Sequence, residues 1–441
     1  MPSRRLSLTF YNALLPLGLL FMAPAALVKM RRRQGRWQDF GQRFGFFDTA
    51  KRGALASLPI DNRLWMHAVS VGEVGVARKL IAALLKHSPE RGIVLTTTTP
   101  TGYRLAEEIE QAFPGRVVAL YSPLDLRPVA RRMLDQLQPR HIVLVEAEIW
   151  PNLLSEATKA GIPVTLVNAR LSPRSERKYL RFRNIIAPIF QMLRHVCVQE
   201  PEDVARWAAL GVDPERIILT GSVKYDPQGS APDAEQVQRF EALLSSTSLS
   251  GRPLLLAAST HAGEEKEMAK IYQELKVKHP TLGFLIVPRH YERGPEVQAE
   301  LLSLGLTSQL RSNYSPGRTN ILIIDSTGEL KAWQELVTIV IIGKSFLAEG
   351  GQNPAEAVMA SKPVVFGPHM ENFIPLVNLL LASNGALQVG GLDELSLALD
   401  HLLTNSTQRE DLASAGRAAL MHHDGATNRT VQVIANKNPP P

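Results

Sequence analysis

Short apolar runs alternate with amphipathic stretches along most of this chain, and their lengths predict its secondary structure. In the first half, seven runs have the length of buried strands: residues 64–69, 93–98, 117–120, 142–145, 164–167, 196–198 and 217–219. Apolar residues at helical spacing fill the intervals, as in residues 77–85 and 204–210. Buried strands that alternate with helices predict βαβ units and a mostly parallel sheet.

The pattern stops once and then resumes. Residues 227–232 read Pro-Gln-Gly-Ser-Ala-Pro, which is typical of a linker. Five further strands are predicted at residues 254–257, 284–287, 321–324, 338–342 and 364–366. We therefore expect an α/β protein of four segments: 1–33 as a membrane anchor with a basic flank, 34–226 as a Rossmann-like domain, 227–245 as a linker, and 246–436 as a second Rossmann-like domain. Two such domains facing a central cleft are typical of many glycosyltransferases that use sugar nucleotides.

The N-terminus differs in composition from the rest of the chain. Residues 8–28 are apolar apart from three positions near their start, and roughly 20 residues suffice to cross a bilayer core. A cationic cluster follows at once: Lys29, Arg31, Arg32, Arg33 and Arg36. This excess of downstream cations favours an uncleaved anchor that leaves the body of the protein in the cytoplasm. Two alternatives stay open: a cleaved signal peptide, and an anchor that enters only one leaflet because Pro16 and Pro24 would bend a spanning helix.

Composition narrows the possible partners. Hydrophobic residues make up 45% of the chain and charged residues 21%, which is ordinary for a globular protein. The single Cys197 excludes a disulfide framework, and its apolar neighbours indicate a buried structural thiol. The net charge is +7, but cations and aromatic residues are not interleaved, so nucleic acid is a poor candidate partner. A membrane surface or an anionic substrate fits the charge better.

Two turns that combine glycine and glutamate indicate where the chemistry takes place. One contains Gly72 and Glu73 and follows the apolar run 64–66; the other contains Gly350, Gly351 and Glu356 and follows the run 340–342. Each turn lies where a buried strand should give way to a helix. In doubly wound sheets ligands bind at the carboxyl ends of such strands, so we expect the substrate to lie between the two domains.

Ten short segments, in order, resemble the 3-deoxy-D-manno-octulosonic acid (Kdo) transferase family. They are SVGE (70–73), TPTG (99–102), EAEIWPN (146–152), NARLS (168–172), TGSVKYD (220–226), STHAGEE (259–265), VPRH (287–290), GEL (328–330), GGQNPAE (350–356) and GPH (367–369). The resemblance extends from about residue 8 to residue 425. It implies a glycosyltransferase of the GT-B type that moves Kdo from CMP-Kdo to a lipid A precursor at the cytoplasmic face of the bacterial inner membrane. It also implies that the enzyme needs no cofactor and no metal ion.

The resemblance assigns the reacting carboxylates to the first domain. An inverting transfer needs a base for the acceptor hydroxyl, and Glu73 matches the family's proposed base. The alternative is that Glu73 only places negative charge at a helix N-terminus. Glu146 and Glu148 match a carboxylate pair near the base, and in an extended chain both would point to one face. Capping or a salt bridge is the alternative role for that pair.

The resemblance places the donor site in the second domain. The residues concerned are Ser259, Thr260, His261, Arg289, His290, Gly328, Gly350, Gly351, Asn353 and Glu356. Arg289 and His290 could meet the CMP phosphate, and Glu356 with Asn353 matches positions that hold the ribose. Their ordinary alternatives are a surface charge for Arg289 and a core histidine for His290. In the first domain, Arg170 and Lys224 are expected to face acceptor phosphates or the Kdo carboxylate, although simple solvation fits them equally well.

Three departures from the family pattern affect fine contacts only. Gln42 stands where the family usually has Glu, Lys344 where it has Gly, and Gln352 where it has His. Two other functions remain open on the sequence alone. One is a UDP-sugar transferase or epimerase of the same fold, and the other is a nucleotide-sugar binding protein without catalysis.

Overall fold

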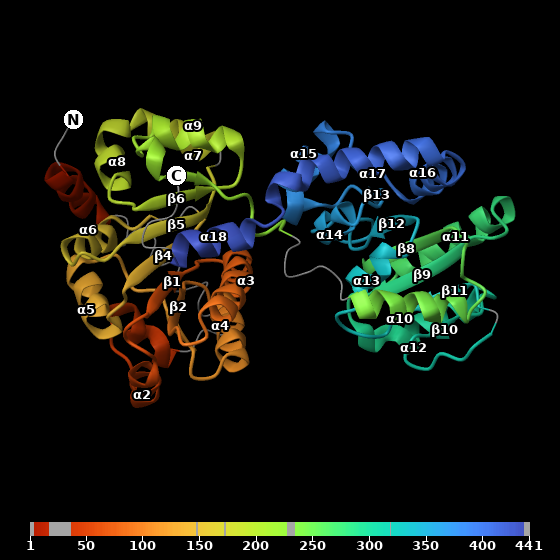
Figure 1. The fold of residues 1–441 in the computed structure, drawn as a ribbon, viewed down its shortest axis with the longest axis horizontal. Coiled ribbons are helices and arrows are strands. Elements are labelled where there is room, and N and C mark those ends of the chain that lie inside the picture. Colours follow the sequence, from red (N-terminus) through yellow and green to blue (C-terminus); the bar gives the residue numbers. More distant parts are fainter. Residues whose placement is uncertain are drawn as a thin grey trace. The chain divides into compact units, whose positions relative to one another are not determined.

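The structure is a computed structural model that describes residues 4–16, 37–146, 149–171, 173–226, 234–317 and 319–435. It divides into two compact units, and each contains one seven-stranded sheet (Figure 1). The first unit comprises Met1–Asp226 together with Gly425–Pro441, and the second comprises Pro227–Asp424. The sequence-based boundaries therefore change at two places. The C-terminal residues from Gly425 belong to the first unit, and residues 234–245 of the expected linker form a helix of the second.

The first sheet contains only parallel pairs, in the order β3-β2-β1-β4-β5-β6-β7. Its strands are β1 (Leu64–His67), β2 (Ile93–Thr97), β3 (Val117–Tyr121), β4 (His141–Val145), β5 (Val164–Ala169), β6 (His195–Val198) and β7 (Ile217–Leu219). Its helices are η1 (Trp37–Phe44), α2 (Thr49–Ser57), α3 (Val71–His87), α4 (Pro100–Ala112), α5 (Arg127–Leu137), α6 (Pro151–Lys159), α7 (Pro173–Arg181), α8 (Arg183–Phe190), α9 (Pro201–Ala209), η2 (Pro214–Arg216) and α18 (Ala426–Ala435). All seven predicted strands of this half are confirmed within one or two residues.

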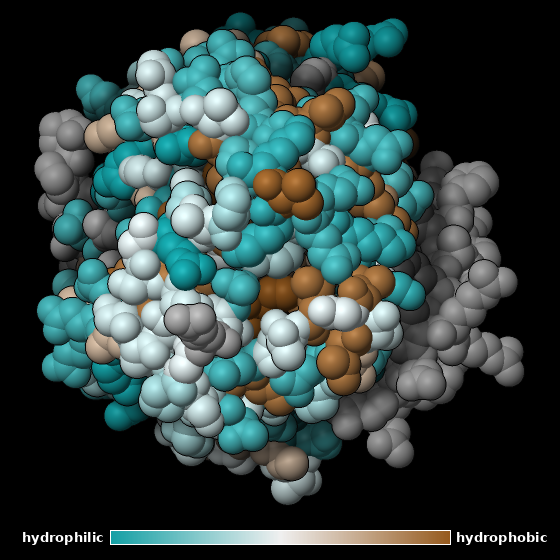
Figure 2. All heavy atoms as spheres, turned by 90° about the vertical axis from the view of Figure 1, so that its right-hand side faces the viewer, coloured by the Kyte–Doolittle hydropathy of each residue, from teal (hydrophilic) through white to brown (hydrophobic). Residues whose placement is uncertain are grey.

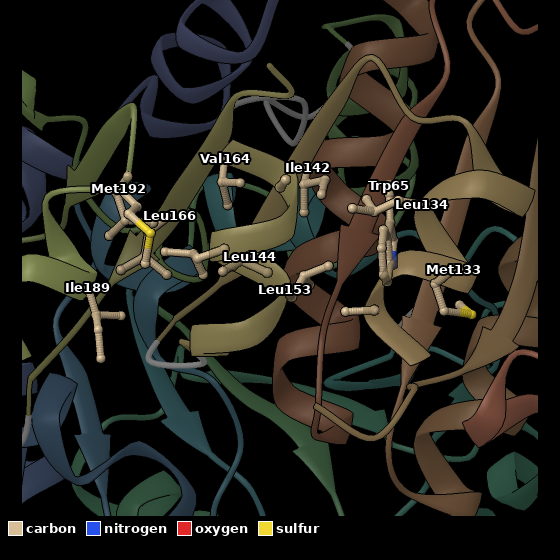
Figure 3. Close-up of a cluster of buried hydrophobic side chains, with 14 of the residues drawn as sticks. Trp65, Met133, Leu134, Ile142, Leu144, Leu153, Val164, Leu166, Ile189 and Met192 are labelled. Carbon is tan, nitrogen blue, oxygen red and sulfur yellow. The ribbon is translucent and has the colours of Figure 1, made fainter. Parts of the chain in front are cut away.

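Alternate residues of the strands build a core on each face of this sheet, as the two-residue period of a strand requires. Trp65, Leu144 and Leu166 point to one face, where Leu153 of α6 and Met133 of α5 pack against them (Figure 3). The opposite face is covered by residues of α3, α4 and α18, and it is formed by a second set of buried side chains that includes Met66, Val145, Leu80, Ile109 and Val431. The sheet is therefore buried on both sides, which explains its continuous apolar strands.

The second sheet is also parallel, in the order β10-β11-β9-β8-β12-β13-β14. Its strands are β8 (Leu254–Thr260), β9 (Gly283–Pro288), β10 (Gln309–Leu310), β11 (Ile321–Ile323), β12 (Ile339–Ile342), β13 (Val364–Phe366) and β14 (Leu387–Gln388). Its helices are α10 (Ala234–Ser245), α11 (Glu264–Lys278), η3 (Tyr291–Arg293), α12 (Gly294–Ser303), α13 (Leu330–Glu335), α14 (Ala355–Met359), η4 (Glu371–Phe373), α15 (Ile374–Ala382), α16 (Leu392–Thr404), α17 (Ser406–Leu420) and η5 (Met421–His423). The five predicted strands are confirmed. The two edge strands β10 and β14 were not predicted, because two residues are too few to form a recognisable pattern.

Both sheets reverse their strand order near the centre. In the first sheet the reversal lies between β1 and β4, and in the second between β8 and β12. The loops that follow these four strands leave in opposite directions, which opens a crevice at the carboxyl ends where ligands of doubly wound sheets bind. The sequence-predicted site residues fall mainly on the loops beside these reversals.

Residues 4–16 form a helix of the first unit, and the remainder of the predicted anchor, residues 17–28, lies outside the described residues. Among the helices that the structure describes, none has both the length and the apolar content needed to cross a membrane. Elsewhere, on the face shown in Figure 2, hydrophobic residues occur in small groups among hydrophilic ones.

Candidate functional site

Glu73 lies in the first turn of α3, directly after β1. Ser70 is the N-cap of this helix, and its hydroxyl accepts the N–H of Glu73 at 3.4 Å. The Glu73 carboxylate folds back: one oxygen accepts the N–H of Val69 at 2.7 Å and the other accepts the Ser70 hydroxyl at 2.8 Å. This reciprocal arrangement is a variant of the capping box, in which Glu73 accepts the N–H of the residue before the N-cap and the hydroxyl of the N-cap itself. The Ser-x-x-Glu spacing in the sequence was the signal that could have predicted it.

Gly72, which shares the sequence-predicted turn with Glu73, does not form a tight turn that would expose this side chain. Gly72 is inside α3, and a Cβ there would meet nothing closer than 3.9 Å, so the turn does not require glycine. Glu73 is only 9% exposed because its side chain caps the helix. Each carboxylate oxygen has two lone pairs, so the capped group can still accept a proton.

Glu146 directly follows β4, the neighbour of β1 in the sheet. Its φ is +64°, a left-handed conformation, and its N–H still reaches the carbonyl of Val167 at 2.9 Å. Burial raises the pKa of Glu146, while Lys224, Arg170 and the amide of Asn168 act in the opposite direction. β4 ends at Val145, and the left-handed φ of Glu146 interrupts the extended conformation there, so the expected pairing of Glu146 with Glu148 stays a prediction. Glu148 itself lies outside the described residues.

Asn168 joins the loops at this end of the sheet and was not singled out from the sequence as a separate residue. It also has a left-handed φ, +52°, at the point where the register between β5 and β6 shifts. Its side-chain oxygen accepts the N–H of Val223 at 3.0 Å, and its carbonyl accepts Gln199 at 2.7 Å. Its amide lies 3.5 Å from Glu146. Asn168 thus ties the loops after β4, β5, β6 and β7 together.

The two predicted cations lie beside Glu146. Arg170 is exposed, Lys224 is half-buried, and both lower the pKa of Glu146 through their charge. The turn that carries Lys224 is held by Lys79 of α3, whose ammonium donates to the carbonyls of Val223, Lys224 and Asp226 at 3.2–3.3 Å. The structure therefore brings Glu146, Arg170 and Lys224 together at the carboxyl edge of the first sheet, next to the loop of Glu73.

His67, the last residue of β1, lies beneath this loop. Its Nδ1 lies 2.9 Å from the hydroxyl of Thr96 and 3.2 Å from that of Ser122, and its ring meets the edge of Trp150 with centroids 4.6 Å apart. Among the described residues its Nε2 has no hydrogen-bond partner. Burial lowers the pKa of His67 to about 3, so the ring is neutral at physiological pH. A neutral imidazole here forms an uncharged contact between β1 and the residue before α6.

In the second unit, the loops after β8 and β9 bring the first group of predicted donor residues together. The N–H of Arg289 donates to the carbonyl of Thr260 at 2.9 Å, and the rings of His261 and His290 lie with centroids 6.1 Å apart. Arg289 and His290 are both exposed, so the alternative of a core histidine at position 290 is wrong. Burial lowers the pKa of His261, and Lys344 acts in the same direction, while the backbone of Ser259 and the carboxylate of Glu264 oppose them. A cationic, donor-rich edge of this kind suits an anion.

Two consecutive buried glutamates at the start of α11 organise these loops, and sequence reasoning assigned them no role. Glu264 accepts four backbone N–H groups: those of His261 (3.0 Å), Lys344 (2.7 Å), Ser345 (3.2 Å) and Phe346 (3.2 Å). Both glutamates are fully buried. The loops after β8 and β12 are thus fixed on one carboxylate.

Glu265 fixes the loop after β9 in the same way. One of its oxygens accepts the hydroxyl of Thr260 at 2.9 Å and the guanidinium of Arg293 at 2.7 Å. Gly343 allows these loops to approach, because a Cβ there would lie 2.5 Å from the carbonyl oxygen of Ser259. Ser259 itself has a left-handed φ of +56°.

The second predicted turn lies after β12. Gly350 and Gly351 have φ values of +113° and +63°, and a Cβ on Gly351 would lie 2.4 Å from the sulfur of Met370. The side-chain oxygen of Asn353 accepts the N–H of Ala355 at 3.1 Å, which starts α14. Glu356, in the first turn of α14, lies 3.4 Å from the ammonium of Lys331 in α13.

Gly328 is on a different loop from the other donor residues. It follows β11, lies two residues before α13, and is exposed with a φ of +77°. The helix that it precedes carries Lys331, the ion-pair partner of Glu356. Gly328 is thus connected through α13 to the other predicted donor residues at the carboxyl edge of the second sheet.

Gln42, the first departure from the family pattern, has a structural role. It is 3% exposed, and its side-chain oxygen accepts the N–H of Tyr121 at 2.9 Å at the end of β3. This contact attaches η1 to an edge strand of the first sheet. Lys344 contributes its backbone N–H to Glu264, and nothing in the structure explains Gln352.

Comparisons with known proteins agree with this architecture. Residues 38–227 match the family model described as 3-deoxy-D-manno-octulosonic-acid transferase (kdotransferase). The 3-deoxy-D-manno-octulosonic acid transferase of Haemophilus influenzae is 33% identical over 433 residues, which cover 96% of this chain and 97% of that protein. The Bordetella pertussis transferase of the same name is 35% identical, with 92% and 94% covered. A UDP-GlcNAc 2-epimerase from Neisseria meningitidis shares the fold, with a TM-score of 0.52, 14% identity and coverage of 85% of this chain and all of that one.

Proposed function

The chain belongs to the Kdo transferase family and is a glycosyltransferase, and we propose that it transfers Kdo from CMP-Kdo to a hydroxyl of the lipid A precursor lipid IVA with inversion. The observation that carries this proposal is the group of Glu73, Glu146, Arg170 and Lys224 at the carboxyl edge of the first sheet. Carboxylates serve an acceptor hydroxyl, and cations serve phosphate or carboxylate groups of the substrates.

We assign the role of general base to Glu73. The acceptor hydroxyl attacks the anomeric carbon of Kdo while its proton passes to the Glu73 carboxylate. The bond from that carbon to the CMP oxygen breaks, and CMP leaves with the electron pair. The capping bonds from Val69 and Ser70 hold the carboxylate in place before the acceptor binds, so that less ordering is required at the moment of reaction.

We assign CMP-Kdo to the carboxyl edge of the second sheet. Arg289 and His290 are exposed there, and a guanidinium can meet a phosphate through two parallel hydrogen bonds. Glu356 offers a carboxylate to the ribose hydroxyls, and Gly350 and Gly351 allow the backbone to approach the nucleotide. Lys331 would have to share Glu356 with the ribose.

The acceptor is a lipid, so the reaction belongs at a membrane. We place the enzyme at the cytoplasmic face of a bacterial inner membrane, with residues 8–28 as its anchor. The cations that follow at residues 29–36 would each add roughly 1 kcal/mol of attraction to anionic lipids.

The test is direct transfer. Purified protein, lipid IVA and a CMP-Kdo supply should give a product heavier by one or more Kdo residues, and the anomeric configuration of the product should be opposite to that of the donor. A UDP-sugar in place of CMP-Kdo is the control and should give no product. Transfer from the UDP-sugar, or a product with the donor's configuration, would refute the proposal.

A further inference from the structure

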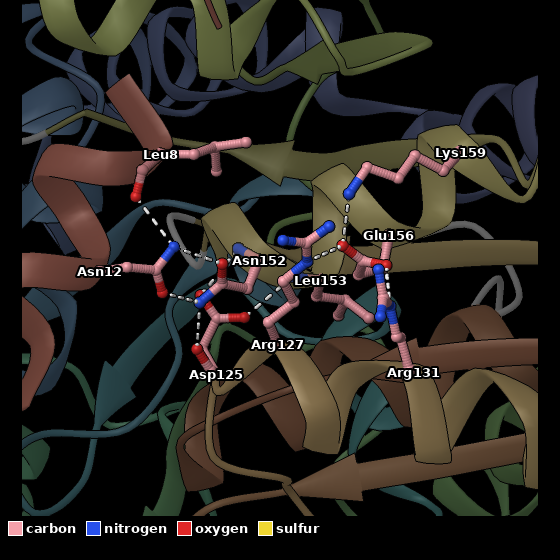
Figure 4. Close-up of polar contacts among 9 residues, drawn as sticks. All are labelled: Leu8, Asn12, Asp125, Arg127, Arg131, Asn152, Leu153, Glu156 and Lys159. Atoms are coloured by element: carbon pink, nitrogen blue, oxygen red, sulfur yellow. Dashed lines mark hydrogen bonds and ion pairs between the residues drawn. The ribbon is translucent and has the colours of Figure 1, made fainter. Parts of the chain in front are cut away.

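The helix of residues 4–16 lies against the first unit through its polar side. The side-chain amides of Asn12 and Asn152 form a reciprocal pair: Asn12 donates to Asn152 at 3.0 Å, and Asn152 donates back at 2.8 Å (Figure 4). Asn152 is 2% exposed and lies at the start of α6. Two amides that satisfy each other in this way make a specific contact rather than a loose association.

A carboxylate behind this pair strengthens the docking. Asp125 accepts the N–H groups of Asn152 and Leu153 at 3.0 and 2.9 Å, and it also accepts the hydroxyl of Tyr11 from the N-terminal helix. The Asn152 amide donates in addition to the carbonyl of Asp125 at 2.6 Å. Ser7, one turn before Tyr11, is 1% exposed. The three residues Ser7, Tyr11 and Asn12 therefore face the protein.

An adjacent side of the same helix is apolar and open. Leu6, Phe10 and Leu14 are 59%, 49% and 49% exposed, and their spacing of four residues places them in one row. A helix on the surface of a soluble protein normally turns its apolar stripe inward and its polar residues outward. Here three large apolar side chains face outward while Ser7, Tyr11 and Asn12 face the protein, so we expect the row to meet an apolar environment outside the protein.

The charges around this helix favour an anionic lipid surface. Arg4 and Arg5 are exposed at its start. On α5 and α6, Glu156 pairs with three cations: Arg127 at 2.8 Å, Arg131 at 2.6 Å and Lys159 at 2.6 Å (Figure 4). The cations are 53%, 54% and 50% exposed and outnumber the carboxylate, so the cluster carries net positive charge. The sequence after residue 16 continues as an apolar run to residue 28.

We infer that residues 4–16 are an amphipathic helix docked on α6 by the Asn12–Asn152 and Tyr11–Asp125 contacts, and that its apolar row of Leu6, Phe10 and Leu14 lies in the plane of an anionic bilayer surface. The helix does not enter the bilayer as the first part of a spanning segment. Because the docking is rigid, it fixes which side of the first unit faces the lipid acceptor. This inference refines the proposed membrane location and rests on it.

The first experiment tests the docking in the full-length protein on vesicles of phosphatidylethanolamine and phosphatidylglycerol. Asn12→Cys with Asn152→Cys, which removes the amide pair but keeps the Tyr11–Asp125 contact that should hold the helix in place, should be joined by a short reagent that reacts with two thiols. Phe10→Cys with Asn152→Cys is the matched control, because position 10 faces away, and it should not be joined. The native Cys197 is fully buried and does not compete. No joining of positions 12 and 152 on vesicles would overturn the docking.

The second experiment measures depth with an environment-sensitive dye on Leu6→Cys, Phe10→Cys or Leu14→Cys and quenchers at known positions in the lipids. An in-plane helix gives a similar depth at all three positions. A spanning helix changes depth by roughly 12 Å over the eight residues, at 1.5 Å per residue, and would overturn the inference. Leu302→Cys, at an exposed leucine of the second unit, should show no quenching.

Two further outcomes separate the possibilities. If a second copy of the protein covers the row, the dye is shielded from lipid quenchers and the protein is dimeric in solution; this would also overturn the inference. Both readouts are independent of catalysis. Failed Kdo transfer with intact joining and equal depths would refute the proposed function and leave the docked helix standing. Successful Kdo transfer without joining, or with unequal depths, would refute the docked helix and leave the proposed function standing.

Discussion

The carboxylate of Glu264 accepts the backbone N–H of Lys344 at 2.7 Å, across 80 positions of the sequence. Through this bond and its three companions, the loops after β8 and β12 are held in one arrangement. The four N–H groups would otherwise point into a buried space with no acceptor. The geometry of this edge therefore depends on a group that need not touch the donor.

Replacement of Glu264 by Gln tests this dependence. The amide keeps one acceptor oxygen but directs an NH₂ group at backbone N–H donors, so we expect the second unit to lose about 2–4 kcal/mol of stability. The affinity for CMP should fall with it, because the loops that carry His261 and Lys344 separate. Denaturant unfolding and a CMP titration measure the two effects. Glu267→Gln, on the partly exposed side of α11, is the control and should cost at most about 0.5 kcal/mol.

Glu73 can be tested as a base separately from its role as a cap. Glu73→Gln keeps a side chain that suits the third position of a capping box, so stability should change by less than about 1 kcal/mol while kcat falls roughly 10²–10⁴-fold. Ser70→Ala removes the cap and should cost about 1 kcal/mol, and it should lower kcat far less than Glu73→Gln, because the N–H of Val69 still holds the carboxylate. Thermal unfolding and single-turnover transfer distinguish the two variants. If Glu73→Gln kept near-normal turnover, Glu73 would not be the general base.

Removal of polar side chains from the carboxyl edge of the second sheet, where we place CMP-Kdo, should weaken nucleotide binding. Arg289→Ala should raise the KM for CMP-Kdo by roughly tenfold or more, because a charged hydrogen bond contributes about 1.5–3 kcal/mol. Calorimetry with CMP measures the same loss. Glu356→Ala should also weaken CMP binding, and more than Lys331→Ala if the carboxylate contacts the ribose. Equal effects of Glu356→Ala and Lys331→Ala would mean that only the ion pair between them matters.

His67 gives the first unit a pH-dependent stability of known sign. The pKa of this buried histidine is about 3 in the folded chain and about 6.5 in the unfolded chain. Its stabilising contribution is therefore complete above pH 6.5 and is lost as the pH falls from about 6.5 towards 3. When the pH is lowered from 7 to 5, this one group should therefore reduce the free energy of unfolding by roughly 2 kcal/mol.

The His67→Asn variant should have a correspondingly smaller loss of stability between pH 7 and pH 5, measured by denaturant unfolding at each pH. In the native protein, the imidazole NMR signals of His67 should keep the values of the neutral form at pH 5. Signals that titrate near pH 6.5 would show that the ring is not isolated from water.

The sequence was sufficient for every strand except β10 and β14, because each of the others is an apolar run between helical patterns. It was not sufficient for the features that depend on distant parts of the chain. One such feature is the left-handed backbone at Glu146, which no local residue pattern announces. Glu264 could be recognised only as the first residue of a helix, since its four partners are set by the approach of two loops. The capping by Glu73, by contrast, was present in the local spacing.

The assignment of residues 425–435 to the first unit could not be read from the sequence for the same reason. Their apolar spacing predicts a helix equally well in either domain. The contact that attaches them to the first unit comes from the Asp226 carboxylate, which accepts the N–H groups of Gly425 and Thr427 at 3.0 and 2.5 Å. Such a contact between residues about 200 positions apart leaves no local pattern.

This return of the chain has a consequence for its biosynthesis. A ribosome releases residues in order, and Val431, Val433 and Ile434, which complete one core of the first unit, emerge only after the whole second unit. The first unit therefore stays unfinished while the whole of the second is translated, and the two mature together rather than in turn. A premature stop at codon 425 would spare every residue of the second unit yet leave the first unit with an open core.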